Sequence, residues 1–476
     1  MTVAPSRSNT LPHYQKIFHA LNSCLQLARR SNSARIASLA FPLPPLDPLA
    51  VLLTLADEHQ RQCYLESPSR GQAIAAWDEL VGQSFSGGDR FQAAREYLAT
   101  WQTRVEAASH LQEGPYFFCS FSFFDTVAKA TEGFAPATVL LTRWQVVRQK
   151  KQCTLIANAL IKPHTVLAPL ARTIAKQLDQ LQSIPLIYSF QDTDTWQPQL
   201  QPQLQPQLSP NDAQTFQHKV RQTLTAIETS QLQKQVVAHA LEVTRKQPFH
   251  RSISLPRLRS QHPDCYVFSF SGAQNTHFIG ASPERLLSIH QGRLVTDALA
   301  GSAPRGQSAV ADYTLGQQLL NTLKEQREHR LVLDFIVQQL QAEGLSPRYS
   351  TPPGLLRLSH IQHLHTPICA DLPDHISPLT LVEALHPTPA VAGVPTATAC
   401  DFIRRGEPCD RGLYAAPLGW VDPHGNSEFI VGIRSALIQG NRARLYAGAG
   451  IVAGSDPAKE LAEIQLKLQA LAEALG

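Results

Sequence analysis

The 476-residue chain lacks any continuous apolar run of about 18 residues, the length that a membrane-spanning helix requires. Its first residues, MTVAPSRSNTLPHYQKIF, contain no apolar stretch of the kind that a secretion signal carries. We therefore expect a protein that neither crosses a membrane nor is secreted.

Paired cysteine motifs and clusters of basic residues are also missing. The eight cysteines include no C-x-x-C pair, the spacing that is typical of zinc sites and redox motifs. Lysine and arginine are scattered and the net charge is only +4, so no basic surface of the kind that binds nucleic acid is expected. We predict reduced, mostly buried thiols in a cytoplasmic protein without a nucleic-acid partner.

An apolar fraction of 43% indicates a globular protein with a large core. Runs of predicted strands and runs of predicted helices follow one another without regular alternation, which favours an α+β fold with antiparallel sheets. Strands are predicted at 116–124, 137–149, 152–161, 264–272, 276–289, 292–302 and, around a turn at 422–426, within 416–450. Helices are predicted at 12–30, over most of 211–243, at 312–343 and from Pro457 onward, with Asp456 as the N-cap.

A four-residue repeat, WQPQLQPQLQPQLSP from Trp196, interrupts this pattern. Its prolines deny the backbone a regular ladder, so residues 191–212 are predicted to be a linker or surface excursion. The rest divides into a mainly helical part at 1–110, a first sheet segment at 111–190 and a region at 213–476 that contains the candidate site residues described below.

The C-terminal stretch GAGIVAGSDPAKELAEIQLK contains a G-x-G-x-x-A pattern at Gly448, Gly450 and Ala453. This pattern is typical of a dinucleotide-binding turn, but that fold needs a further parallel strand and an acidic residue about 20 positions on. The sequence ends at Gly476 before either, so the glycines are expected to serve another ligand.

Two acidic clusters could bind a metal. Glu460, Glu463 and Lys467 share one face of the last predicted helix, and apolar neighbours suggest that this helix is buried. Buried carboxylates need a partner, and Mg²⁺ suits oxygen ligands. The word KEQREH places Glu325 and Glu328 within one turn of another helix. Solvated charged faces are the alternative interpretation of both clusters.

Seven words, in order, resemble the chorismate-utilising enzyme family and most closely its isochorismate synthases. The resemblance runs from about Lys234 to the C-terminus. The words are GASPERLL, TDALAGSAPRG, KEQREH, HPTPAVAGVP, DRGLYAAPLGW, FIVGIRSALI and YAGAGIVAGSDPAKELAEIQLK.

The resemblance implies a single α+β domain similar to anthranilate synthase component I, with two large antiparallel sheets, helices outside and the active site between them. It implies that Glu328 and Glu463 bind Mg²⁺ and that Glu460 and Glu325 support the waters of the metal. Chorismate would then be the substrate, and the metal would neutralise its ring carboxylate.

Further roles carry over by the same resemblance. Arg434 and Lys467 are expected to bind substrate carboxylates, and Glu284 of the word SPE is the expected general acid. Lys234 is the expected general base, although Gln235 and His239 stand where the family usually has valine and arginine. The pocket is expected to be lined by Gly301, Ser302, Tyr414 and Gly448.

We therefore expect a Mg²⁺-dependent isochorismate synthase that serves naphthoquinone, siderophore or salicylate synthesis. A salicylate synthase, which also eliminates pyruvate, is the alternative, and the apolar Ala390 in HPTPAVAGVP favours the first activity. A non-catalytic chorismate-binding scaffold is an alternative of another class. No glutaminase subunit is expected, and the sequence leaves the oligomeric state open.

Overall fold

The fold is described by a computed structural model that covers residues 10–107, 114–126, 133–183, 208–358 and 361–476. The helices are α1 (Thr10–Ser31), α2 (Pro48–Leu55), α3 (Arg90–Gln102), α4 (Leu167–Gln182), α5 (Pro210–Glu228), α6 (Arg251–Gln261), α7 (Ala309–Asn321), α8 (Leu323–Ala342), α9 (Pro378–Leu385), α10 (Thr396–Gly406) and α11 (Pro457–Leu475). The strands are β1 (Arg35–Leu43), β2 (Gln62–Ser67), β3 (Gln72–Phe85), β4 (Val105–Ala107), β5 (Phe117–Phe121), β6 (Ala137–Gln149), β7 (Gln152–Ile161), β8 (Lys234–Thr244), β9 (Tyr266–Ser271), β10 (Thr276–Ser282), β11 (Arg285–His290), β12 (Arg293–Pro304), β13 (Arg348–Tyr349), β14 (Gly354–Arg357), β15 (Ile361–Asp371), β16 (Gly393–Val394), β17 (Pro417–Val421), β18 (Ser427–Val431), β19 (Ser435–Gln439) and β20 (Arg442–Val452). The α+β class predicted from the sequence is confirmed.

The strands of the described residues form one hydrogen-bonded network with two large antiparallel arms. The arms meet at β6, which pairs with β3 along its whole length on one side. On its other side β6 pairs first with β5 and then with β7. One arm continues from β3 through β2, β9, β10, β19 and β20 to β8, and the other from β5 through β17, β18, β11 and β12 to β15. The two expected sheets are therefore continuous through β6.

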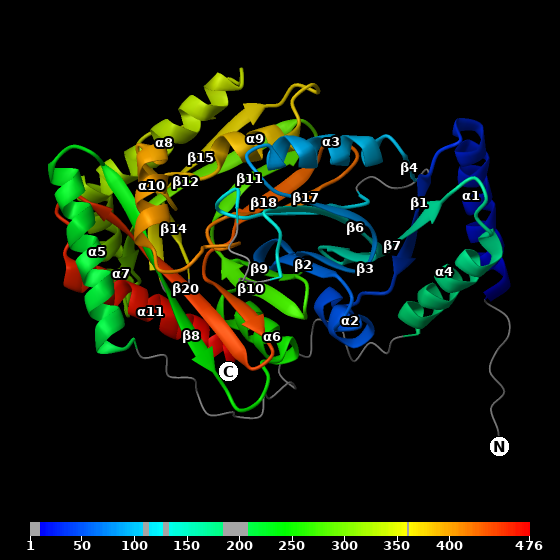
Figure 1. Cartoon of the computed structure of the whole chain (residues 1–476), viewed down its shortest axis with the longest axis horizontal. Helices are drawn as coiled ribbons and strands as arrows, with labels where there is room; N and C mark the ends of the chain where they lie inside the picture. Colours follow the sequence, from blue (N-terminus) through cyan, green and yellow to red (C-terminus); the bar gives the residue numbers. More distant parts are fainter. Residues whose placement is uncertain (1–9, 108–113, 127–132, 184–207, 359–360) are drawn as a thin grey trace.

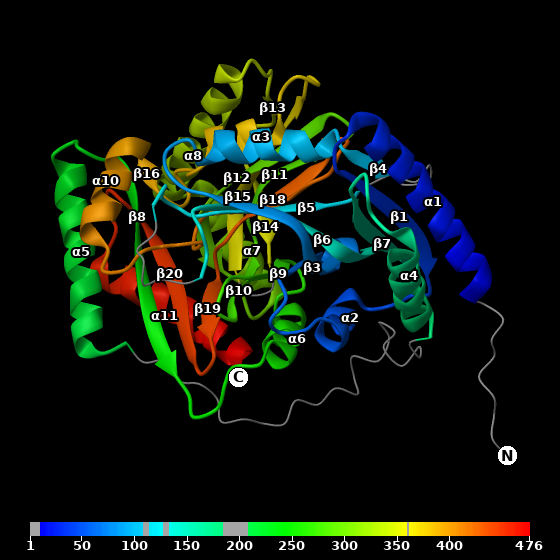
Figure 2. The same ribbon diagram turned by 45° about the vertical axis from the view of Figure 1, so that its right-hand side comes forward.

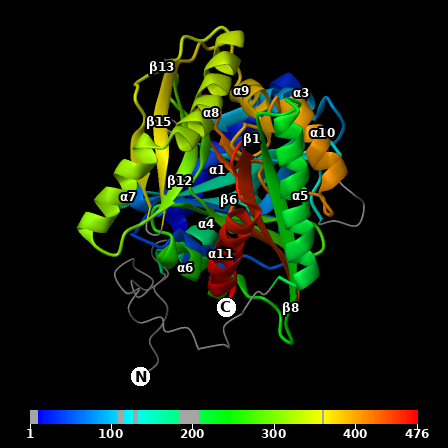
Figure 3. The same ribbon diagram turned by 90° about the vertical axis from the view of Figure 1, so that its left-hand side faces the viewer.

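Alternation of side chains along the strands produces two cores. On β2, Cys63 and Leu65 face the core between the arms, whereas Tyr64 faces the helices outside. Helices α3, α8 and α9 cover one side of the molecule, and α1 and α4 pack together at one end (Figures 1 and 2). Helix α11 packs on β20 and contacts α5 and α6, and Figure 3 shows it below α8. Two helices far apart in sequence thus approach the same end of the sheet.

Several predicted elements are confirmed within the described residues. The strands at 137–149 and 152–161 are β6 and β7, and the turn at 422–426 joins β17 to β18. Asp456 caps α11, because its side chain accepts hydrogen bonds from the backbone N–H groups of Ala458 and Lys459. The predicted N-terminal helix is α1. Local signals were sufficient for these elements.

Other predicted boundaries were wrong. The helix expected over 211–243 ends at Glu228, where Ser230 adopts a left-handed backbone with φ of 61°, and the rest is β8. The helix expected at 312–343 is broken at Thr322, whose extended backbone separates α7 from α8. Within residues 1–110, the strands β1, β2 and β3, which were not predicted, lie among the helices α1, α2 and α3. Most of the repeat at 191–212 lies outside the described residues, and its end already belongs to α5.

No helix in the described part of the chain is both long enough and apolar enough to cross a membrane.

A buried ionic network links four of these elements. Glu66 on β2 is fully buried, and its two carboxylate oxygens accept hydrogen bonds at 2.7 Å from Arg148 on β6 and Arg259 on α6. Arg259 also donates two hydrogen bonds to Asp47, which caps α2. A buried carboxylate shared in this way holds α2 and α6 against the sheet.

We predict that Glu66→Ala lowers the free energy of unfolding by about 3–5 kcal/mol, because it leaves buried guanidinium charge without its carboxylate. Urea denaturation measures this change. The control is Glu228→Ala at the exposed end of α5, expected to change stability by less than about 0.5 kcal/mol. A similar small change in both variants would contradict a structural role for the network.

Candidate active site

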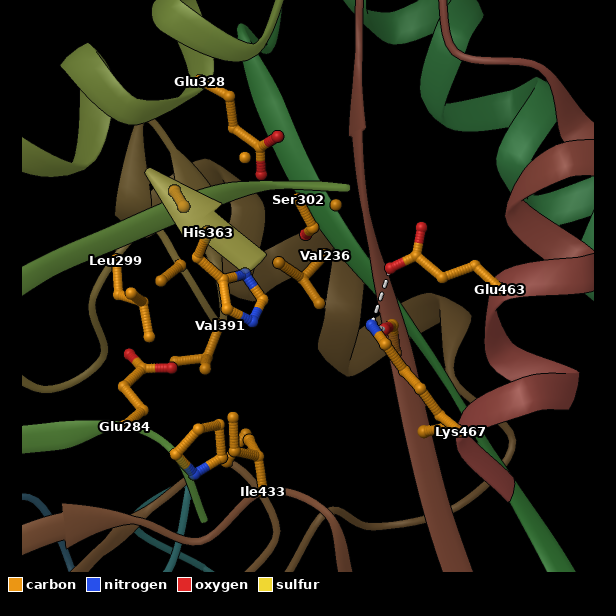
Figure 4. A pocket seen from close by; sticks show the side chains of 18 of the residues that line it. Val236, Glu284, Leu299, Ser302, Glu328, His363, Val391, Ile433, Glu463 and Lys467 are labelled. Atoms are coloured by element: carbon orange, nitrogen blue, oxygen red, sulfur yellow. Dashed lines mark hydrogen bonds and ion pairs between the residues drawn. The ribbon is translucent and has the colours of Figure 1, made fainter. Parts of the chain in front are cut away.

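One pocket brings together every site residue predicted from the sequence. It opens between α8, α11 and the strands β8, β12, β15 and β20, and Figure 4 shows side chains from all sides converging on it. The predicted residues in its lining are Lys234, Glu284, Gly301, Ser302, Glu325, Glu328, Tyr414, Arg434, Gly448, Glu460, Glu463 and Lys467. Segments separated by almost half of the chain therefore build one site.

The glycines of the C-terminal word lie on a strand and not on the turn that the sequence suggested. Gly448 and Gly450 belong to β20, and the turn before α11 contains Gly454, whose φ is +84°. A Cβ on Gly450 would lie 2.8 Å from Oε1 of Glu328, and a Cβ on Gly448 would lie 2.8 Å from the hydroxyl of Tyr414. The missing side chains make room for the pocket.

Four carboxylates from two helices face this pocket. Glu325 and Glu328 project from α8, and Glu460 and Glu463 from α11. Burial, and then the charge of Glu328, raises the pKa of Glu325. Burial, and then the charge of Glu463, raises the pKa of Glu460. Glu463 also raises the pKa of Glu325, and Glu328 that of Glu460, so carboxylates of the two helices repel one another across the gap.

Three lysines partly compensate this negative charge. Nζ of Lys234 lies 2.7 Å from Glu328, and Nζ of Lys467 lies 2.7 Å from Glu463, a contact drawn in Figure 4. Lys467 also donates to the carbonyl of Gly448. The third is Lys324, with Nζ 3.7 Å from Glu460. Three of the carboxylates thus have an ammonium neighbour.

A metal would have to be held by a few of these oxygens together with waters. Among the described residues, no three Asp, Glu, His or Cys side chains form a ready-made metal cage. Mg²⁺ keeps several waters and is often bound through only one or two carboxylates. An all-oxygen donor set with excess negative charge therefore fits Mg²⁺, whereas it would not suit a metal that prefers nitrogen or sulfur.

Glu284 lies apart from this cluster, at the turn between β10 and β11. Burial raises the pKa of its carboxyl to about 7, although the charge of Lys234 opposes the shift. The turn is fixed because Oγ of Ser282 donates to the carbonyl of Val431 at 2.6 Å, and the N–H of Val431 donates to the carbonyl of Glu284. The site therefore holds one carboxyl that is largely protonated just below neutral pH.

Arg434 provides positive charge on another wall. Its backbone adopts a left-handed conformation with φ of 49°, which is uncommon for a residue with a side chain. No carboxylate of the described residues pairs with it, and its nearest recorded partner is Sγ of Cys265 at 4.0 Å. Strained backbone at a ligand-facing cation is typical of functional sites.

Sequence reasoning missed His363 and most of the apolar wall. His363 on β15 points into the pocket between Glu328 and Glu284 (Figure 4), and burial, with Arg434 and Lys467 nearby, lowers the pKa of its imidazole to about 3. The apolar wall consists of Leu299, Ala390, Val391 and Ile433. Its only signal in the sequence was Ala390, because single apolar residues on separate segments carry no pattern.

Gln235 and His239, the two residues of β8 that differ from the usual family sequence, do not line the pocket. Lys234 and Val236 line the pocket, whereas Gln235 takes the opposite face of the strand and accepts a hydrogen bond from Thr223 on α5. His239 shares the face of Gln235, because side chains alternate along a strand. Neither departure therefore weakens the assignment of Lys234 to the site.

Residues 19–476 match the family of chorismate binding enzymes. The chain belongs to this family. It is 35% identical over 448 residues to the salicylate biosynthesis isochorismate synthase of Pseudomonas aeruginosa, and the match covers 93% of this chain and 90% of that protein.

Solved structures of other proteins agree with the fold. The menaquinone-specific isochorismate synthase MenF from Escherichia coli superposes with a TM-score of 0.75 at 28% identity, covering 96% of this chain and 100% of the other. Anthranilate synthase component I from Streptococcus pneumoniae superposes with a TM-score of 0.69 at 20% identity, covering 90% of this chain and 97% of the other. The similarity to anthranilate synthase component I shows the fold alone. Which reaction this chorismate-binding enzyme catalyses must therefore be argued from the residues of its own site.

We predict that the stability of the protein falls as the pH rises through about 7, because the folded state holds a proton on Glu284 that the unfolded state releases near pH 4.5. The stabilisation is complete below about pH 4.5 and amounts to roughly 3 kcal/mol. Glu284→Gln cannot ionise and should lack this loss when urea denaturation is compared at pH 5 and pH 8.

Glu473→Gln, on the exposed side of α11, serves as the control and should keep the pH dependence of the parent. An equal loss of stability in Glu284→Gln and in the parent would show that Glu284 does not hold this proton.

Proposed function

We propose that the chain is an isochorismate synthase that converts chorismate to isochorismate with Mg²⁺. This proposal depends on one observation: a single pocket contains Glu284, Lys234, the four carboxylates of α8 and α11, and the cations Arg434 and Lys467. The family match and the relative from Pseudomonas aeruginosa, which covers nearly the whole chain, support the same activity.

The substrate would be held by its carboxylates. Chorismate carries two of them, and the pocket offers Arg434 and Lys467 as cations. A guanidinium can bind a carboxylate through two parallel hydrogen bonds, which an ammonium cannot. The apolar wall on the remaining side suits the ring and excludes water from it.

The reaction adds water at one ring carbon while a hydroxyl leaves from another, so it needs one base and one acid. We assign the acid to Glu284, whose raised pKa keeps a proton available near pH 7. We assign the base to Lys234, which is 1% exposed and held in place by its contact with Glu328. Both side chains face the same pocket from different strands.

The metal would be held by Glu328 and Glu463, with Glu325 and Glu460 supporting its waters. When bound, Mg²⁺ would neutralise the ring carboxylate of the substrate. The partly buried and mutually repelling carboxylates support this assignment, because they need more positive charge than the lysines supply.

The alternative is a salicylate synthase, which would eliminate pyruvate from the same intermediate. Ala390, Val391 and Ile433 give the pocket an apolar wall without a hydroxyl that could orient the enolpyruvyl group. Such a contact changes selectivity by only about 1–3 kcal/mol, so it favours release of isochorismate without excluding some elimination.

We also propose that the protein works in a reducing compartment such as the cytoplasm. All eight cysteines are free thiols, and five of them are buried. Burial raises the pKa of thiols such as Cys63 and Cys119, which keeps them unreactive.

We predict that the purified protein, given chorismate and Mg²⁺, releases isochorismate with little pyruvate or salicylate. Chromatography with mass detection identifies the ring product, and a coupled dehydrogenase assay measures pyruvate. The control is the same incubation without protein, which corrects for spontaneous decay of both ring compounds. Stoichiometric pyruvate would establish the salicylate synthase, and unchanged chorismate would favour the non-catalytic scaffold.

We predict that Lys234→Ala lowers turnover by about 10² or more, the usual scale for the loss of a general base. Lys234→Arg should be similarly impaired, because a guanidinium keeps the positive charge beside Glu328 but cannot give up its proton. Steady-state kinetics with chorismate separate the effect on turnover from the effect on binding.

Lys246→Ala, at an exposed lysine just beyond β8, is the matched control and should match the parent. If Lys234→Arg retained most of the turnover, the lysine would be a counter-ion of Glu328 and another group would be the base.

A further inference from the structure

Lys324 differs from the other two lysines of the pocket in its surroundings. It is the second residue of α8, and its Nζ lies 3.7 Å from Oε1 of Glu460 on α11. Its side chain is 35% exposed, whereas the Glu460 side chain is 7% exposed. The contact therefore joins the two acidic helices at the rim of the pocket, where one partner can still reach solvent.

The charge of Lys324 acts on carboxylates of both helices. It lowers the pKa of Glu460 on α11 and that of Glu325 on α8, in each case against the effect of burial. Its distance of 3.7 Å is long for a hydrogen bond, so the attraction to Glu460 is mainly between charges. Such a contact is easily broken and reformed.

The other two ammonium groups are more firmly held. Lys234 is fully buried against Glu328. Lys467 is held twice, by Glu463 and by the carbonyl of Gly448. Within the described residues, Lys324 has no recorded hydrogen bond besides those of the helix backbone, so it is the ammonium that can move most readily.

We propose that Lys324 is an exchangeable counter-ion of Glu460 and Glu325, which offsets part of their charge in the metal-free protein and competes with Mg²⁺ for the acidic cluster. The proposal rests on the proposed function, because that function supplies the metal. Mg²⁺ binding would place a divalent charge near this ammonium, so Lys324 must leave Glu460 or be repelled where it lies. Lys324 would thereby weaken metal binding and set the Mg²⁺ concentration at which the site fills.

The test compares Mg²⁺ binding to the full chain and to Lys324→Met, which keeps the length of the side chain but removes its charge. Isothermal titration with Mg²⁺ alone should give a dissociation constant at least about fivefold lower for the variant, the lower end of usual coupling between two binding events. In excess chelator the variant should melt at a lower temperature than the parent, because its carboxylates have lost a cation. Saturating Mg²⁺ should raise its melting temperature by more than it raises that of the parent.

Two further variants make the comparison specific. Lys324→Arg keeps the charge and should bind Mg²⁺ with an affinity close to that of the parent. Lys459→Met removes the same charge from an exposed residue next to Glu460 that does not line the pocket, and it should also match the parent. Lys324→Gln replaces the methionine variant if circular dichroism shows that the latter does not fold.

Equal or weaker Mg²⁺ binding by Lys324→Met would overturn the proposal. A gain of the same size in Lys459→Met would also overturn it, because the effect would then come from net charge near the helix. One outcome is that the parent protein turns over chorismate with Mg²⁺ while Lys324→Met binds the metal no more tightly than the parent. In that case this proposal fails and the proposed function stands. If the parent neither binds Mg²⁺ nor turns over chorismate, both fail together.

Discussion

The repulsion among four carboxylates, of which Glu460 is buried and the other three are partly buried, is the constraint on which the pocket depends. Glu325 and Glu328 approach from α8 and Glu460 and Glu463 from α11, and partial burial reduces the water that can screen their charges. The protein meets this constraint by placing an ammonium next to three of the four groups. These lysines lie on three different elements, β8, α8 and α11. The packing of the two helices against the sheet therefore also determines where the positive charges lie relative to the carboxylates.

Strand β8 connects this charge pattern to the rest of the fold. Its pocket face carries Lys234 and Val236, and the main-chain carbonyl of Val236 accepts a hydrogen bond from the buried Arg411. Arg411 also donates to the carbonyl of Val391 and pairs with Glu407. One guanidinium therefore fixes a strand and a neighbouring loop that both line the pocket. The position of Lys234 in the pocket therefore depends on the contacts of Arg411, which does not itself line the pocket.

The sequence predicted the class of fold and the membership of the site better than it predicted element boundaries. Ordered words such as KEQREH and SPE placed Glu328 and Glu284 in the pocket, because each word keeps a local geometry that its family shares. His363 and Ile433 were missed, since a single residue on a strand or turn shows no periodicity that would mark it. The end of α5 was missed for a similar reason: a left-handed Ser230 stops the helix, and serine carries no strong signal for that conformation.

The break at Thr322 has a consequence for the acidic groups. An unbroken helix over 312–343 would have placed Glu325 in mid-helix, whereas the break makes it a residue of the first turn of α8. Glu460 likewise lies in the first turn of α11. Unpaired N–H groups give the start of a helix a partial positive charge, and a carboxylate there is stabilised by about 0.3–1 kcal/mol. Two helices thus direct their positive ends toward one acidic pocket, and the backbone itself helps the protein to hold these charges close together.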